Sequence, residues 1–266
     1  KLEYERNGIK YFQKNLEKAS AGGRSRYEAE GIAVEHEIRQ YESGLQEYRL
    51  LVKNTGYIPL DITCALPFAE KLDIAGCEMQ YFTSEWGKEY GLVTDIIKPL
   101  ILQNERGRSS NEYYPQMFFK EGDKYKIAIV VAWSGNWKIE IEQNEQDFMV
   151  SAGITDVNFR KTVQPHEEFD SFRILAARTQ EGTLDEITRA FTLWHREYNS
   201  PKSAEAYKIP VEWNHWWPYE DAGVNEEMFK AHADIAKELG CEICVLDAGW
   251  FGQGSWECYV DGNQGL

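Results

Sequence analysis

The stretch Tyr125-Lys-Ile-Ala-Ile-Val-Val-Ala-Trp133, followed after three residues by Trp137-Lys-Ile-Glu-Ile141, decides the fold of the larger part of this chain. Both runs are short, rich in β-branched residues and bounded by turn residues, which is typical of strands. The link between them, Ser134-Gly135-Asn136, is polar and contains a glycine. This pattern predicts a β-hairpin with Trp133 and Trp137 on either side of its turn.

The sequence around this pair repeats the same pattern. Five further runs read as strands, and turn residues rather than helices separate them: residues 33–38, 46–52, 58–64, 148–154 and 172–177. So many short strands without intervening helices indicate a large antiparallel sandwich. We therefore assign residues 1–182 to an all-β antiparallel sandwich domain.

At Thr183 the pattern changes from strands to a helix. Thr183-Leu-Asp-Glu186 is a capping box, in which the threonine hydroxyl and the glutamate carboxylate accept hydrogen bonds from amides of the first turn. Apolar residues then recur at spacings of three and four and predict one amphipathic helix: Leu184, Ile187, Phe191, Trp194 and Tyr198. We assign residues 183–208 to this linker helix and the polar boundary that follows it.

Residues 209–266 follow a third pattern. A strand-like run at 209–213 precedes a helical stretch at 225–239, and an apolar run at 242–246 comes next. This order predicts a βαβ unit, which belongs to a doubly wound sheet or to a (β/α)8 barrel. A barrel needs about 250 residues. We therefore expect residues 209–266 to be the incomplete beginning of one of these two folds, and the chain to be a fragment.

The amino-acid composition argues against some classes of binding partner. Twenty-nine Lys and Arg against forty-four Asp and Glu give a net charge of −15, which argues against nucleic acid and anionic membranes as partners. No apolar run approaches the roughly 18 residues of a membrane span. Five cysteines form an odd, sparse set that suits a reducing cytoplasm. Nine Trp and fifteen Tyr are an unusually large aromatic content, and aromatic rings can stack on sugars.

Asp247 is the leading candidate for a site residue. It follows the second predicted strand of the βαβ unit, at the edge where ligands gather in α/β folds. Asp247 before Ala248 and Gly249 is equally typical of a residue that only closes a strand. Trp250, three residues later, favours a site, because a stacking ring beside a carboxylate is a combination suited to sugars.

The first strand of this unit ends in Trp213-Asn-His-Trp-Trp217-Pro-Tyr219, where four aromatic residues stand among polar ones. Asn214 and His215 can donate or accept hydrogen bonds at a substrate. The alternative is that these rings pack against the preceding sandwich domain. Cys241 and Cys244 point to opposite faces of a strand and have no second ligand pair. We therefore expect neither a metal nor another cofactor.

With these residues identified, the chain resembles the family 36 glycoside hydrolases, the bacterial α-galactosidases of clan D. Three groups of residues carry the resemblance: Ser84-Glu-Trp-Gly-Lys-Glu89 with Arg106-Gly-Arg-Ser-Ser110 and Tyr114-Pro-Gln-Met-Phe118, then Trp133-Ser-Gly-Asn-Trp137, and finally residues 213–252. The third group is the most specific, and it ends in Val245-Leu-Asp-Ala-Gly-Trp-Phe-Gly252.

The resemblance implies a β-supersandwich, a linker helix and a (β/α)8 barrel that hydrolyses α-galactosidic bonds with retention. Retention requires a carboxylate nucleophile and a second carboxyl group as acid and base, about 5–5.5 Å apart. In the family both are Asp residues on later barrel strands. We therefore expect both catalytic residues beyond Leu266, no catalytic residue within this chain, and no activity of the fragment alone.

The resemblance also implies a set of sugar-binding residues. These are Asp247, Asn214, Trp216 and Trp250 at the barrel, together with Trp86 reaching the sugar from the sandwich domain. The family commonly has a second Asp where this chain has Ala248, which leaves the exact sugar open. The expected partner is an α-galactoside or a related oligosaccharide.

Two other function classes fit the same residues. The chain can serve as a non-catalytic carbohydrate-binding module, since the residues expected here bind sugar and do not cleave it. It can also be an assembly module, because sandwich domains of large enzymes often build contacts between copies in a homo-oligomer. A later barrel strand that ends in an acidic residue would favour the enzyme over both.

Overall fold

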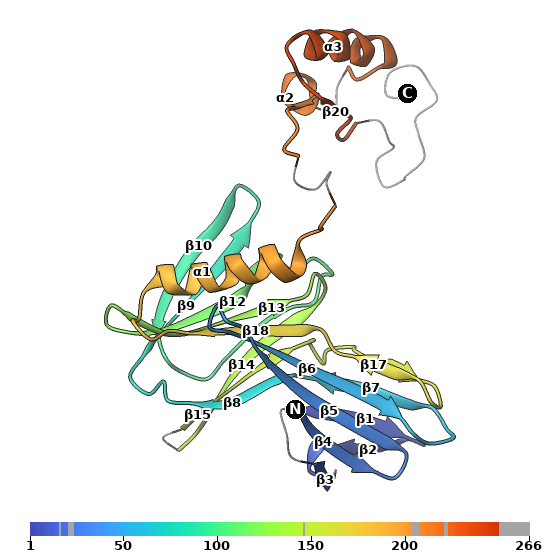
Figure 1. The fold of residues 1–266 in the computed structure, drawn as a ribbon, viewed down its shortest axis with the longest axis vertical. Helices are drawn as coiled ribbons and strands as arrows, with labels where there is room; N and C mark the ends of the chain where they lie inside the picture. The colour runs from blue at the N-terminus through green and yellow to red at the C-terminus, as the bar shows by residue number, and fades with distance from the viewer. Residues whose placement is uncertain (16, 21–23, 146, 204–207, 221–222, 250–266) are drawn as a thin grey trace. The chain divides into compact units, whose positions relative to one another are not determined.

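The structure is a computed structural model that describes residues 1–266 except 16, 21–23, 146, 204–207, 221–222 and 250–266. The chain divides into two compact units, Lys1–Asn199 and Ser200–Leu266. Figure 1 shows the strands of the first unit and the helices of the second. Among the described residues, no helix combines the length and apolar character that crossing a membrane requires.

The described part of the first unit is almost entirely β-structure. Its elements are β1 (Leu2–Arg6), β2 (Ile9–Phe12), a 3-10 turn (Gln13–Asn15), β3 (Glu17–Ser20), β4 (Arg24–Ala29), β5 (Ile32–Gln40), β6 (Leu45–Asn54), β7 (Leu60–Ala65), β8 (Phe68–Leu72), β9 (Glu78–Glu85), β10 (Lys88–Ile96), β11 (Leu100–Asn104), β12 (Glu112–Glu121), β13 (Lys124–Ala132), β14 (Trp137–Asn144), β15 (Asp147–Gly153), β16 (Lys161–Val163), β17 (Glu168–Asp170), β18 (Arg173–Arg178), α1 (Leu184–Trp194) and a π-helical turn (His195–Asn199). The five further runs predicted as strands correspond to β5, β6, β7, β15 and β18.

These strands form one large sheet and two small ones. The large sheet has ten strands in the order β10-β9-β12-β13-β18-β6-β5-β4-β3, with β17 also paired to β6. The small sheets have four strands each, in the orders β16-β7-β1-β2 and β11-β14-β15-β8. Neighbouring strands in all three sheets run antiparallel. The predicted antiparallel β-sandwich is therefore confirmed.

The predicted hairpin between β13 and β14 is wrong. β13 pairs with β12 and β18 in the large sheet, whereas β14 pairs with β11 and β15 in a small one. Asn136 Oδ1 accepts a hydrogen bond from Gly107 N at 2.7 Å, and the buried Trp137 indole donates to Ser109 O at 2.7 Å. Residues 134–136 thus connect the large sheet to a small one. The loop that contains Gly107 and Ser109 holds this connection through the two hydrogen bonds.

One face of the large sheet carries the main hydrophobic core. On β6, Tyr48 packs into a cluster with the β11-β14-β15-β8 sheet, and Leu50 and Val52 pack into a cluster with the β16-β7-β1-β2 sheet. Because alternate residues of a strand share a face, these three side chains lie on the same side of the large sheet. The two small sheets therefore cover different parts of one face.

A polar bridge also connects the sheets. The hydroxyl of Tyr48 on β6 donates to Glu70 Oε1 on β8 at 2.6 Å, and Arg178 on β18 pairs with the same carboxylate. Burial is the main reason that the pKa of Tyr48 rises to about 12, and the bond to Glu70 raises it further. The phenol therefore stays protonated and keeps donating at neutral pH.

Helix α1 covers part of the opposite face, as its apolar stripe predicts. Ile187, Ala190 and Trp194 are buried against Leu45 of β6 and Ala128 of β13. The outermost residues of the predicted stripe, Leu184 and Tyr198, are 46% and 51% exposed and contribute less to this contact.

The start of α1 differs in one respect from the predicted capping box. Thr183 Oγ1 accepts a hydrogen bond from Glu186 N at 3.2 Å, as expected of an N-cap. The Glu186 carboxylate instead accepts from Gln180 N at 2.7 Å and Glu181 N at 3.1 Å, ahead of the helix. It therefore fixes the approach of the chain to α1.

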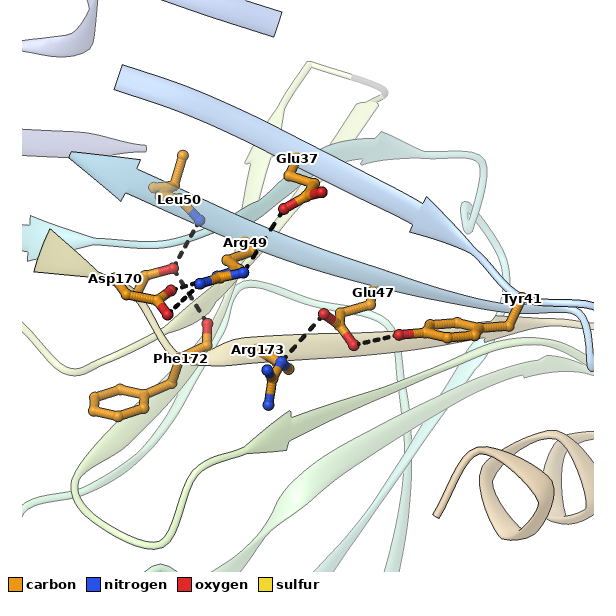
Figure 2. Close-up of polar contacts among 9 residues, drawn as sticks. Glu37, Tyr41, Glu47, Arg49, Leu50, Asp170, Phe172 and Arg173 are labelled. Atoms are coloured by element: carbon orange, nitrogen blue, oxygen red, sulfur yellow. Dashed lines mark hydrogen bonds and ion pairs between the residues drawn. The ribbon is translucent and has the colours of Figure 1, made fainter. Parts of the chain in front are cut away.

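Polar side chains occupy the outer face of β6 farther along the strand (Figure 2). The buried carboxylate of Glu47 accepts from the Tyr41 hydroxyl at 2.7 Å and pairs with Arg173 at 3.2 Å. Arg49, two residues on, pairs with Asp170 of β17 and lies 3.8 Å from Glu37 of β5. These ion pairs tie β5, β6, β17 and β18 together.

The second unit contains a parallel βαβ arrangement. Its described elements are β19 (Glu212–Asn214), α2 (Trp216–Tyr219), α3 (Glu226–Glu238) and β20 (Ile243–Val245). β19 and β20 are parallel, with Asn214 opposite Val245. Asn225 caps α3 by accepting from Met228 N at 2.9 Å, and Gly240 leaves the helix with φ +90°, where only glycine is unstrained. The predicted βαβ order is therefore present.

The apolar residues of α3 are only partly buried within this unit. Ala236 is buried and Phe229 is half-buried, but Ile235 and Leu239 are 52% and 79% exposed. A two-stranded sheet covers only a narrow part of a helix. Apolar positions along the rest of α3 therefore face solvent within this unit.

Trp137 and Trp86 offer a matched test of the sandwich. Trp137→Ala should lower the unfolding free energy of the first unit by about 3–5 kcal/mol, because it empties a fully buried site and removes the bond to Ser109 O. Trp86→Ala should change it by less than about 0.5 kcal/mol, since that ring is 97% exposed. Urea denaturation followed by circular dichroism measures both. Equal midpoints for the two variants would contradict the sheet-to-sheet position of Trp137.

Candidate functional site

The candidate site lies in the second unit, where β19 and β20 end. Asn214 is the last residue of β19, and Asp247 stands two residues after the end of β20. Because the strands are parallel, their carboxyl ends lie at the same edge, and there Asn214 Nδ2 donates to Asp247 Oδ2 at 2.9 Å. Two residues predicted to bind sugar, 33 positions apart in sequence, are thus in direct contact.

Each polar atom of this pair has a defined partner. Asn214 Oδ1 accepts from Trp216 N at 2.8 Å, which orients the amide so that its NH2 group points to Asp247. Asp247 Oδ1 accepts from Ala248 N at 2.7 Å. Each carboxylate oxygen can accept more than one hydrogen bond. Asp247 is only half-buried, so it keeps acceptor capacity for a further donor.

The same contacts set the charge of the site. The hydrogen bond from Asn214 is the main cause that lowers the pKa of Asp247, and the bond from Ala248 N adds to it. Asp247 is therefore ionised at neutral pH and acts only as an acceptor. Such a group suits recognition of hydroxyl donors rather than proton transfer.

His215 follows Asn214 in the chain, and its side chain is fully buried. Its Nδ1 accepts from Asp247 N at 2.9 Å, and its Nε2 lies 3.1 Å from Ala248 O. The interpretation that His215 contacts a substrate is therefore wrong for this structure, since both ring nitrogens bind the backbone. One signal in the sequence could have indicated this role. His215 comes just after the first predicted strand of the βαβ unit, and Asp247 comes just after the second.

The aromatic residues after β19 divide into two groups. Trp213 stacks on His232 of α3, with ring centroids 5.5 Å apart, and the Tyr219 hydroxyl lies 2.6 Å from His232 Nε2. Within the second unit these rings pack β19 and α2 on α3. Trp217, by contrast, is 86% exposed.

The three tryptophans predicted to bind sugar have different positions. Trp216 is the first residue of α2 and is half-buried beside Asn214. Trp86 lies in the turn between β9 and β10 of the first unit and is almost fully exposed. Trp250 lies outside the described residues. Their contacts with a sugar stay predictions.

Comparisons with known proteins agree on one family. The model described as "Glycosyl hydrolase family 36 N-terminal domain" matches residues 25–164. The curated alpha-galactosidase Mel36A of Lactobacillus acidophilus is 33% identical over 177 residues, which cover 60% of this chain and 23% of that protein. Alpha-galactosidase AgaA of Geobacillus stearothermophilus is 27% identical over 218 residues, covering 76% and 28%.

Solved structures show the same fold. AgaA in complex with raffinose aligns with a TM-score of 0.81 at 21% identity, over 94% of this chain and 39% of that one. AgaA in complex with stachyose aligns with a TM-score of 0.81 at 20% identity, over 97% and 42%. The chain spans between 21% and 32% of the length of the curated relatives that it matches.

Removing the Asn214 amide tests the electrostatics of the pair. In Asn214→Ala the pKa of Asp247 should rise toward its ordinary value, because the largest interaction that favours the carboxylate is lost. Titration of carboxyl ¹³C shifts in aspartate-labelled protein measures this. The pKa of Asp95, which its own bond from Lys98 lowers in the first unit, should not move. An unchanged pKa of Asp247 would show that Asn214 does not contact it in solution.

Proposed function

The chain belongs to glycosyl hydrolase family 36 through its N-terminal domain, and from this membership we propose that it forms the first part of a retaining α-galactosidase. The whole protein would cleave terminal α-galactosidic bonds of oligosaccharides. Relatives named as alpha-galactosidases, and family structures in complex with raffinose and stachyose, support this substrate class.

We also propose that the second unit is the beginning of a (β/α)8 barrel. Support comes from the parallel order β19-α3-β20 and from the alignment of solved family structures over nearly the whole chain. In such barrels the active site lies at the carboxyl ends of the strands. This is the edge at which Asn214 and Asp247 meet.

The observation that carries the proposal is the hydrogen-bonded Asn214–Asp247 pair at that edge. The Asp247 carboxylate is ionised, half-buried and held by two donors, so its free lone pairs can accept hydroxyl groups of a terminal galactose. Ala248 follows Asp247 and offers no second carboxylate. We therefore assign the hydroxyl contacts at this strand end to Asp247 alone.

In this proposal the residues of the chain bind and orient the sugar. Asp247 fixes one edge of the galactose ring, and Trp216 provides an aromatic face on which its C–H groups can stack. The nucleophile and the acid–base carboxyl group would come from later barrel strands, outside residues 1–266. The role of Asp247 is then to hold the anomeric carbon in line for their attack.

The proposed function is tested by assaying the whole protein on raffinose and on an aryl α-galactoside. Galactose should be released, and ¹H NMR of the first product should show the α-anomer, as retention requires. Residues 1–266 alone should release none. Absence of hydrolysis by the whole protein while it still binds galactose would instead support a carbohydrate-binding module.

The substitution Asp247→Ala distinguishes two roles of Asp247, namely binding the sugar and only closing a strand. In the whole protein kcat/KM on raffinose should fall by about 10- to 100-fold, because a charged acceptor for the sugar is lost. Asp247→Asn should lose less, since its amide oxygen can still accept a hydroxyl proton. Steady-state kinetics on protein of verified folded content measures this.

Asp234→Ala is the matched control, because Asp234 is an exposed acidic residue on α3 of the same unit. It should leave kcat/KM unchanged. A strand-closing role for Asp247 gives a different result, namely a lower Tm with wild-type kcat/KM in Asp247→Ala, and that result would refute the proposed role.

A further inference from the structure

Hydrogen bonds of His215 connect the ends of the two parallel strands next to the candidate site. The β19–β20 ladder ends with Asn214 opposite Val245, so the residues that follow have no further strand pairing between them. His215 N donates to Val245 O at 3.4 Å, and the imidazole then binds the backbone of Asp247 and Ala248. The side chain thus continues the connection past the last paired residues.

The partners of the ring define its protonation state. A backbone N–H can only donate and a carbonyl oxygen can only accept. Nδ1 therefore carries no proton where it meets Asp247 N, and Nε2 carries the proton that it donates to Ala248 O. The ring is a neutral imidazole with one tautomer. Phe229 of α3 lies edge-on to it at 6.4 Å, which fixes the plane of the ring.

These two bonds act on the backbone around the Asp247 carboxylate. One holds the amide that precedes the Asp247 Cα atom, and the other holds the carbonyl of the next residue. The two peptides held in this way flank the 247–248 peptide, whose Ala248 N–H donates to Asp247 Oδ1 at 2.7 Å. A change at His215 would therefore rotate or release the segment that determines where the carboxylate lies.

We propose that His215 is a positioning residue, which sets the orientation of Asp247 toward the sugar through hydrogen bonds to the backbone and makes no contact with the substrate. The kinetic part of this inference rests on the proposed function. Its structural part, that His215 holds residues 247 and 248, does not. The two parts can therefore be tested separately.

Three substitutions separate the two hydrogen bonds. His215→Asn places an oxygen near the Nδ1 position and can still accept from Asp247 N. His215→Gln places an amide nitrogen near the Nε2 position and can still donate to Ala248 O. His215→Phe keeps the ring volume and loses both bonds. His195→Phe, at an exposed position of the first unit, is the control for the loss of a histidine.

Hydrogen exchange of the whole protein, followed by mass spectrometry, tests the structural part. The peptide that contains residues 246–249 should exchange at least about 10-fold faster in His215→Phe, because the Asp247 amide loses its acceptor. His215→Asn should restore slow exchange, and peptides from β12 and β13 should not change in any variant. Equal exchange of the 246–249 peptide in wild type and His215→Phe would overturn the inference.

Kinetics of double variants test the positioning part. His215→Phe should lower kcat/KM on raffinose by about 10- to 100-fold, mainly by raising KM, and His215→Asn should recover most of it. In an Asp247→Ala background, His215→Phe should have no further effect, because it acts through Asp247. Full multiplication of the two effects would refute positioning and leave a general role in folding.

A whole protein without α-galactosidase activity would refute the proposed function and not this inference. The inference is then decided by exchange of the 246–249 peptide. Faster exchange in His215→Phe supports it, with a changed pKa of Asp247 as further support, and exchange equal to that of the wild type overturns it.

Discussion

The alternation of side chains along a strand is the constraint on which the first unit depends. Strands β6 and β13 direct apolar residues to one face of a ten-stranded sheet, and that face is too wide for one four-stranded sheet to cover. Two small sheets and the crossing of the chain between layers follow from this requirement. The other face needs less cover, since α1 shields its apolar part and ion pairs around Glu47 and Arg49 occupy the next part (Figure 2). The sandwich thus consists of one large sheet with two small sheets packed side by side on the same face.

The second unit is held together differently. Its two strands are short, and side-chain hydrogen bonds at their ends add to the few backbone bonds between them. β19 and β20 pair over only three residues each. Asn214 and His215 extend this pairing toward Asp247, one through the carboxylate and the other through the backbone. The polar groups that hold the strand ends together are therefore the same groups that shape the candidate site.

The features that could be predicted from the sequence are those that local chemistry determines. Period-two runs identified the strands, and the cap at Thr183 and the helix after Asn225 were visible in a few residues each. The position of Asp247 after an apolar run predicted the strand end at which it meets Asn214. The link at Ser134–Asn136 was misread because a polar turn with glycine has the same local chemistry whether it closes a hairpin or joins two sheets. His215 was interpreted as a substrate contact because its actual partners, Asp247 N and Ala248 O, lie 32 and 33 residues away in the chain, after β20.

Strand β6 contributes to all three hydrophobic clusters that the described residues of the first unit form. Leu45 packs under α1, Tyr48 belongs to one core of the sandwich, and Leu50 and Val52 belong to the other. No cluster can lose its packing without disturbing a strand that the other two share. The halves of the supersandwich therefore lack the independence of separate domains, and loss of β6 from the sheet removes all three cores together. We therefore expect the first unit to unfold as a single cooperative block, with its heat of unfolding absorbed in one transition.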